Sequence, residues 1–105
     1  MEQLENIKPH QLVPGINARL VHGAQSTVSF VDIVKGTKMP AHKHPHEQVT
    51  YIVEGNLEME IGDEFYSLQP GAVHVIPPDT LHSAHALTDC KVIDFFSPSR
   101  DDYRF

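Results

Sequence analysis

The feature that most constrains the fold of this chain is a series of short runs in which apolar residues recur at every second position. These runs end at Gly, Pro, Asn or Asp, and they cover residues 27–34, 48–54, 57–61, 64–68, 72–76, 81–86 and 91–96. A two-residue period is that of a strand whose side chains point alternately to its two faces. No segment of ten or more residues carries the 3.6-residue apolar period of a helix. Short strands separated by turn residues predict an all-β sandwich or barrel with little helix.

The clearest hairpin signal lies between residues 57 and 68. Apolar and acidic residues alternate strictly in the run 57–61, and Gly62-Asp63 separates this run from the run 64–68. A two-residue Gly-Asp link between two strand patterns is typical of a tight β-hairpin turn. The length of 105 residues fits one domain with a modest core.

We therefore expect a single domain over residues 1–105. Within it we expect an N-terminal arm over about residues 1–25 and a barrel over about residues 26–97. The short C-terminal tail is charged, and we expect it to be partly loose.

Charge and hydropathy exclude several classes of partner. The formal net charge is −6 and the Lys and Arg residues are scattered, whereas nucleic acid and anionic membranes attract a basic patch. No apolar stretch approaches the ~18 residues of a membrane span, and residues 1–6 lack the basic start and apolar segment of a signal peptide. Cys90 is the only cysteine and opens an apolar strand, which favours a buried structural role. These features predict a cytoplasmic protein with neither nucleic acid nor membrane as a partner.

A cluster of potential metal ligands lies in the segment 42–48, which reads His-Lys-His-Pro-His-Glu-Gln. His42 and His44 are two residues apart and would share one face of an extended segment. The proline that follows ends that strand, so Gln48 can begin another strand that returns past the first. His82 follows a second proline-rich turn. Three imidazoles and one amide oxygen that converge in a β fold would suit a divalent transition metal.

The spacing of Gly36, His42, His44, Gln48 and Gly55 resembles the first motif of the cupin superfamily, with Gln where Glu is usual. The resemblance covers most of the chain and implies a double-stranded β-helix, or jelly-roll, barrel with a metal inside. It also implies that the protein forms a homodimer, as many cupins do.

A later stretch resembles the second cupin motif. Four residues separate Pro77 from His82, but Asp79 stands where glycine is common and Ala86 where asparagine is common. The ligands that the resemblance implies are His42, His44, Gln48 and His82. The metal would be one divalent ion of Ni, Zn, Fe, Mn or Co, since imidazole and amide ligands suit all of these.

The remaining histidines are weaker candidates for metal ligands. For all of the candidate ligands, the alternative is a barrel that has lost its metal. His46 lies in the proline turn and is the weakest candidate ligand. We expect His74 and His85 to line the barrel mouth or to be exposed. His10 and His22 fall outside any motif, and a solvated surface role is expected for both.

Gln in place of Glu changes the charge of the expected site. Three neutral imidazoles and a carboxylate would leave a divalent site at +1, whereas Gln48 leaves it at +2. A more positive centre is a stronger Lewis acid and attracts an anionic substrate better. The substitution therefore favours binding of an oxyanion over oxygen activation.

A second group of candidate residues lies at the end of the last strand. Asp94 and Phe96 share strand parity, and Arg100 follows just past the strand. An Asp that points into an apolar barrel is costly unless it is paired or functional, and Arg can bind a carboxylate with two parallel hydrogen bonds. The alternative is that Asp94 and Arg100 form a structural salt bridge and Phe96 belongs to the core.

The segment 42–48 together with the terminal stretch 94–100 resembles a small single-domain cupin family of pectin and alginate degradation. Members of that family convert 4,5-unsaturated uronates into linear keto sugars. The resemblance implies catalytic roles for Asp94, Phe96 and Arg100 and a small anionic carbohydrate as the substrate. Two alternatives stay open, which are a non-haem metal dioxygenase of small molecules and a non-catalytic cupin that binds a metal and a sugar.

Overall fold

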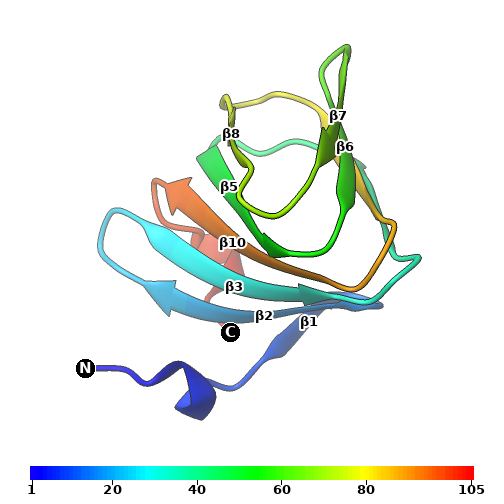
Figure 1. Cartoon of the computed structure of the whole chain (residues 1–105). Helices are drawn as coiled ribbons and strands as arrows, with labels where there is room; N and C mark the ends of the chain where they lie inside the picture. The colour runs from blue at the N-terminus through cyan, green and yellow to red at the C-terminus, as the bar shows by residue number, and fades with distance from the viewer.

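Two antiparallel sheets face one another in the structure, a computed structural model that describes residues 1–105 (Figure 1). The six-stranded sheet has the order β1-β2-β3-β10-β5-β8, and the four-stranded sheet has the order β4-β9-β6-β7. The strands are β1 (His10–Val13), β2 (Ile16–His22), β3 (Thr27–Ile33), β4 (Lys38–His42), β5 (Glu47–Glu54), β6 (Leu57–Ile61), β7 (Glu64–Leu68), β8 (Val73–Ile76), β9 (His82–Ala86) and β10 (Cys90–Ser97). Two short 3-10 turns, η1 (Leu4–Asn6) and η2 (Asp101–Tyr103), lie near the ends. The all-β jelly-roll prediction is confirmed.

Seven of these strands coincide closely with the segments that the two-residue period predicts. The hairpin is also confirmed, because Ile61 pairs with Glu64 across a turn in which Gly62 has a φ of 57°. A positive φ of this kind suits glycine, which has no Cβ to collide with its own backbone. The structure has no helix long and apolar enough to cross a membrane.

Three strands escaped the sequence prediction. β1 and β2 form a hairpin that extends the six-stranded sheet, so a large part of the segment expected as an arm belongs to the sheet. Ile16, Ala18 and Leu20 alternate with Asn17 and Arg19 there, so the two-residue period is present in β2 and the prediction overlooked it. β4 contains Pro40, which a strand tolerates only at a sheet edge or bulge, and β4 is indeed an edge strand. η1 and the residues that precede β1 lie outside the sheets.

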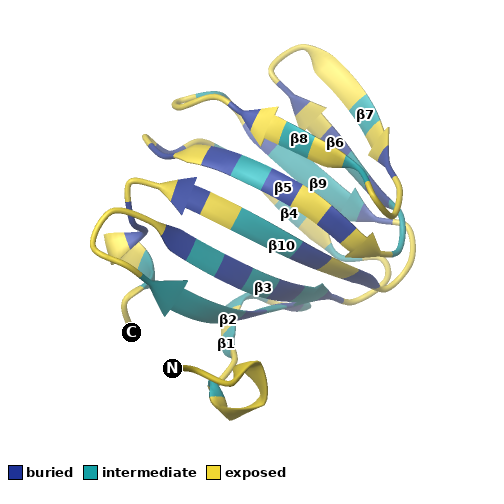
Figure 2. Cartoon of the chain, turned by 60° about the vertical axis from the view of Figure 1, so that its left-hand side comes forward, coloured by how far each residue is buried: buried dark blue, intermediate teal, exposed yellow.

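The inner face of the six-stranded sheet changes character along its central strands. Three consecutive cross-strand rows run over β3, β10 and β5, and they are Val31, Val92 and Ile52; Ser29, Asp94 and Thr50; Thr27, Phe96 and Gln48. We call the first row, with its neighbours Ile33 and Cys90, the apolar half of the barrel interior. The other two rows are the polar half. Figure 2 shows buried residues alternating with intermediate ones along β3, and buried residues alternating with less buried ones over most of β5.

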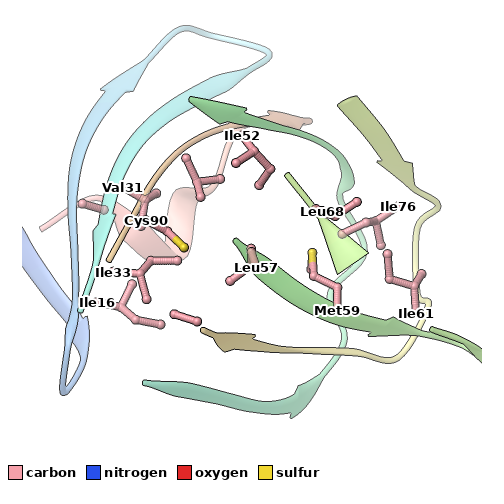
Figure 3. Close-up of a cluster of buried hydrophobic side chains, with 13 residues drawn as sticks. Ile16, Val31, Ile33, Ile52, Leu57, Met59, Ile61, Leu68, Ile76 and Cys90 are labelled. Carbon is pink, nitrogen blue, oxygen red and sulfur yellow. The ribbon is translucent and has the colours of Figure 1, made fainter. Parts of the chain in front are cut away.

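The hydrophobic core contains 13 buried residues from both sheets. In Figure 3, Ile16, Val31, Ile33 and Cys90 gather on one side of the cluster, whereas Met59, Ile61, Leu68 and Ile76 lie on the other side. Burial of a side chain of this size contributes about 1.5–3 kcal/mol to folding. Cys90 donates its thiol hydrogen to backbone carbonyls and is 3% exposed, so the expected burial of this residue is confirmed.

One glycine is required by a close approach between chain segments. Gly55 follows β5 directly with a φ of 89°, and a Cβ at this position would collide with the carbonyl oxygen of Asp89. The same Cβ would stand 2.8 Å from the sulfur of Cys90. Gly55 therefore lets the turn between β5 and β6 pack against the start of β10 at the apolar end of the barrel.

The two outer faces of the sandwich differ. Two apolar rows run over the outer face of the six-stranded sheet, and they are Val28, Phe95, Val49 and Val75; Phe30, Ile93, Tyr51 and Val73. Phe95, Val73 and Val75 are exposed to solvent by 52%, 61% and 50%. The outer face of the four-stranded sheet is charged instead, with Glu58 3.6 Å from His85.

Candidate metal centre and pocket

Three histidines meet at one point of the barrel interior. One ring nitrogen from each of His42, His44 and His82 lies within 4.8 Å of the others. The ring centroids of His42 and His82 are 4.3 Å apart, and those of His44 and His82 are 5.1 Å apart. Histidine nitrogens are common ligands of divalent transition metals, and these three are close enough together to serve one ion. The grouping predicted from the sequence is therefore one that can hold a metal ion.

A main-chain carbonyl orients each of the three rings. The Nδ1–H groups of His42, His44 and His82 donate to the carbonyl oxygens of Pro40, His46 and Thr80 at 2.9, 3.1 and 2.8 Å. A carbonyl can only accept a hydrogen bond, so each Nδ1 carries the proton and each neutral ring keeps its lone pair on Nε2. Hydrogen bonds of this kind fix the tautomer of metal-binding histidines in proteins.

Local backbone irregularity places the first two histidines. The β4–β9 register shifts between Met39 and His42, which marks a bulge around Pro40. β4 ends at His42, and His44 lies in the connection to β5 rather than on the extended segment expected from the sequence. His42 pairs with His82 across the two strands. The bulge and the short connection together turn both side chains toward His82.

Gln48 completes the donor set. Its Nε2 donates to the hydroxyl of Thr50 at 3.0 Å and to Oδ1 of Asp94 at 3.2 Å, and these acceptors fix the orientation of the amide. Oε1 consequently faces His44, 3.1 Å from its Nε2. Burial, reinforced by the charge of Arg100, lowers the pKa of His44 to about 4, so its ring is neutral near pH 7.

The pair formed by His44 and Gln48 fits a cation. Because Nδ1 of His44 carries the ring proton, Nε2 and the amide oxygen present two lone pairs to each other at 3.1 Å. Two acceptors at hydrogen-bond distance need a positive charge between or beside them. Burial also lowers the pKa of His82, which favours the neutral, metal-binding form of that ring. The donor chemistry therefore suits the divalent transition metal that cupins hold.

A pocket begins at these ligands and extends between the sheets. Asp94, Phe96 and Arg100 all line this pocket together with His42 and His82, so the candidate catalytic residues share one cavity with the candidate ligands. The pocket walls also include polar residues that sequence reasoning did not single out, namely Ser29, Thr50, Ser83 and Tyr103.

Asp94 stands at the boundary between the ligands and the pocket. Its Oδ1 accepts hydrogen bonds from Thr50 at 2.7 Å and from Gln48 at 3.2 Å. Burial raises the pKa of Asp94 to about 6, although these hydrogen bonds and the charge of Arg100 act in the opposite direction. Asp94 therefore contacts a candidate ligand directly and faces the space that a substrate would fill.

Arg100 is held on three sides. Its Nε and Nη2 donate to the two carboxylate oxygens of Asp102 at 3.0 and 2.8 Å. The guanidinium carbon lies 4.7 Å from the ring centroid of Phe96 and 3.9 Å from that of Tyr103. The alternative of a structural salt bridge between Arg100 and Asp94 is wrong, because Asp102 is the partner of the guanidinium. Asp102 occupies one edge of the fork and leaves Nη1 free to bind another group.

The C-terminal tail is anchored, contrary to the expectation of a partly loose segment. Ser99 and Arg100 are buried, and the backbone N–H of Arg100 donates to the hydroxyl of Thr27 at 2.9 Å. His22, for which we expected a solvated role, lies 2.8 Å from the same hydroxyl and donates from Nε2 to the carbonyl of Tyr103 at 3.2 Å. No sequence signal marks these contacts, because His22 and Tyr103 are 81 residues apart.

The other histidines lie outside the group of three. His46 is buried in the turn before β5, where its ring packs against His44, and its Nδ1 has no hydrogen-bond partner. His74 packs against Tyr66 at 4.4 Å between ring centroids. His85 faces Glu58 on the outer surface of the four-stranded sheet.

Comparison with known proteins gives a consistent result. The family described as Cupin domain matches residues 29–96. The chain is 29% identical over 96 residues to the pectin degradation protein KdgF of Dickeya dadantii (strain 3937), with 89% of this chain and 87% of that protein covered.

Two solved structures resemble this one over nearly their full length. KdgF from a Halomonas species has 36% identity and a TM-score of 0.87, and the match covers 93% of this chain and 92% of that one. An RmlC-like cupin from Shewanella frigidimarina NCIMB 400 has 26% identity and a TM-score of 0.92, with 98% and 94% covered.

Proposed function

This chain belongs to the cupin family, and from that premise we propose that it is a metal-dependent enzyme that opens 4,5-unsaturated uronates released during pectin or alginate breakdown. The observation that carries the proposal is the union of two groups in one pocket. A donor set of three histidines and a glutamine adjoins Asp94 and Arg100, which are an acid–base group and a carboxylate-binding group. Similarity to a pectin degradation protein over most of the chain supports this substrate class.

In this proposal His42, His44, Gln48 and His82 hold one divalent metal. When bound, the metal would supply positive charge that attracts and polarises the oxygens of an anionic sugar. With four neutral ligands, the full charge of +2 remains at the centre. The structure supports the donor set through the fixed tautomers of the rings and the fixed orientation of the amide.

Arg100 orients the substrate by binding its carboxylate through the free edge of the guanidinium. Asp102 and the two flanking rings already fix the guanidinium plane, so little side-chain freedom is lost when substrate binds. Phe96 provides an apolar surface at the pocket wall for the body of the sugar ring.

Asp94 moves the proton that the reaction requires. It takes the proton of the C1 hydroxyl while the bond between C1 and the ring oxygen breaks, which yields an aldehyde and an enolate. It then returns that same proton to C4, and the enolate becomes a ketone. The substrate has no net gain or loss of atoms or electrons, so the reaction is an isomerisation that needs no oxidant.

The proposal is tested by following 4,5-unsaturated galacturonate by proton NMR with the purified protein. Loss of the ring alkene signal should be faster than in buffer, should stop with a chelator and should return when a divalent metal is restored. If the metal-loaded protein does not change the rate, uronate opening is refuted. Oxygen consumption with a small aromatic or thiol substrate would then favour the dioxygenase class, and sugar binding without turnover would favour a binding protein.

We also propose that two copies associate through the outer face of the six-stranded sheet. The exposed apolar side chains of Phe95, Val73 and Val75 occupy neighbouring strands there, and an exposed patch of this kind commonly marks a contact surface. Light scattering should give a dimer mass for the wild type and a monomer mass for Phe95→Glu. A monomeric wild type would refute the association. The cytoplasmic location stays a prediction.

A further inference from the structure

Ser29 carries a buried hydroxyl that no group of the protein satisfies. The residue is 1% exposed, and its Oγ makes no hydrogen bond. Buried polar atoms in folded proteins are almost always paired, so each exception calls for an explanation. Ser29 is also one of the residues that line the pocket.

The register of the sheet places Ser29 directly beside Asp94. Ser29 on β3 pairs with Asp94 on β10, and Asp94 pairs with Thr50 on β5. Side chains opposite one another in an antiparallel pair have Cβ atoms about 4.5–5.5 Å apart. Asp94 is thus flanked by two hydroxyl residues in one row. On the far side of Ser29, β2 contributes only the apolar Leu20.

The two flanks of Asp94 are used differently. Thr50 and Gln48 both donate to Oδ1, which fixes one oxygen of the carboxylate on the ligand side. Oδ2 makes no hydrogen bond within the protein, and neither does the hydroxyl of Ser29. An unused acceptor and an unused hydroxyl therefore stand next to each other at the pocket wall.

An alcohol group on a ligand would satisfy both atoms at once. Its O–H can donate to Oδ2 of Asp94 while its oxygen accepts from the hydroxyl of Ser29. We propose that Ser29 is a substrate-binding residue that recognises one ring hydroxyl of the sugar and holds it against Asp94. The inference deepens the proposed function and rests on it, since it assigns the hydroxylated side of the uronate to β3.

Stability alone gives no reason for a serine at this position. A buried hydroxyl without a partner costs free energy, whereas alanine would fill nearly the same space without that cost. A residue that weakens the fold and faces a pocket is expected to gain its partner from a ligand. This reasoning gives the inference a signature that a structural role would not produce, because binding and stability should respond to substitution in opposite directions.

The test compares wild type with Ser29→Ala, each loaded with the same metal, by calorimetric titration with galacturonate as an unreactive uronate. We expect Ser29→Ala to bind about 5-fold more weakly, which is the size of one net hydrogen bond. Its melting temperature should be equal to or above that of the wild type. Ser67→Ala, which removes an exposed hydroxyl on β7, is the matched control and should change neither quantity.

Galacturonates that lack the 1-, the 2- or the 3-hydroxyl identify the group that Ser29 contacts, and the 1-hydroxyl is the group from which Asp94 takes a proton in the proposed reaction. One of these analogues should bind the wild type about 5-fold more weakly than galacturonate does, and Ser29→Ala should weaken its binding no further. The inference is overturned if Ser29→Ala binds galacturonate as tightly as the wild type. It is equally overturned if the variant loses affinity for all three analogues alike or melts at a lower temperature in parallel with its weaker binding. If the metal-loaded wild type binds no uronate at all, the proposed function fails and this inference falls with it, so the two failures are distinguishable.

Discussion

The apolar and polar halves of the barrel interior are built on the same three strands, but they have different roles. On β5, Ile52 is fully buried in the core, whereas Gln48, four residues earlier, faces the candidate metal ligands. On β10, Val92 belongs to the core and Asp94, two residues later, lines the pocket. The division falls at the same level on both strands because the register aligns them.

Fold stability and chemistry are therefore separated along the strands rather than between the sheets. The apolar half removes hydrocarbon from water, and its contribution depends on volume and packing. The polar half holds donors and acceptors in fixed directions, and its contribution depends on hydrogen-bond geometry. Substitutions in one half should therefore leave the property of the other half largely intact.

The largest effect is expected from removal of a ligand. His82→Ala should reduce bound metal, measured by elemental analysis, to the background level, and uronate turnover should fall to the rate in buffer. His85→Ala is the matched control, because His85 lies on the same strand but faces the outer surface. Full metal occupancy in His82→Ala would show that His82 is not a ligand.

Asp94→Asn should separate proton transfer from metal binding. Asn keeps an oxygen that can accept from Thr50 and Gln48, so metal content should match that of the wild type. Loss of the acid–base group should reduce kcat by about 10²–10⁴-fold. If kcat changes by less than twofold in the metal-loaded variant, Asp94 does not carry the proton.

A cavity in the apolar half should cost stability and spare the chemistry. Ile52 is fully buried, and Ile52→Ala should lower the free energy of unfolding by about 2–5 kcal/mol in urea titrations. Metal content and turnover well below the melting temperature should stay near wild-type values. Val53→Ala, one residue along on the exposed face, should change the free energy by about 0.5 kcal/mol or less. Loss of metal in Ile52→Ala would show that metal binding in the polar half depends on packing in the apolar half.

Arg100→Lys tests the polar half of the barrel interior, and its expected effect on KM is smaller. Lysine keeps the charge but lacks the planar fork that Asp102 and the flanking rings position. KM for the uronate should rise about 10-fold, in line with the loss of one charge-assisted hydrogen bond, while metal content stays constant. An unchanged KM would argue against Arg100 as the carboxylate clamp.

Sequence patterns predicted the strands best where one face of the strand is polar. The run 57–61 alternates Leu, Met and Ile with Glu, and its limits agree with those of β6. The run 27–34 was harder to interpret, because apolar Val28 and Phe30 face outward while Thr27 and Ser29 face inward. The two-residue period identified the strand there, but it did not show which face of the strand points to the interior.

The candidate site was predictable where ligands lie close together in sequence, as His42, His44 and Gln48 do. The support of Arg100 was not predictable, since His22 and Thr27 reach the tail only through the folded sheet. Ser29 gave no signal either, because a single serine in a strand is equally compatible with solvent. Position relative to a pocket is a property of the tertiary structure alone.

Main-chain carbonyl groups orient the three histidine rings, and this affects how the site can change in evolution. The acceptors that fix the rings are carbonyl oxygens, and no point substitution deletes a carbonyl. Gln48 differs, because its orientation depends on the side chains of Thr50 and Asp94, which mutation can remove. The orientation of the three histidines is thus insensitive to point substitution of the groups that fix it. Gln48, the fourth ligand, is the position at which substitution can most easily change the charge of the centre.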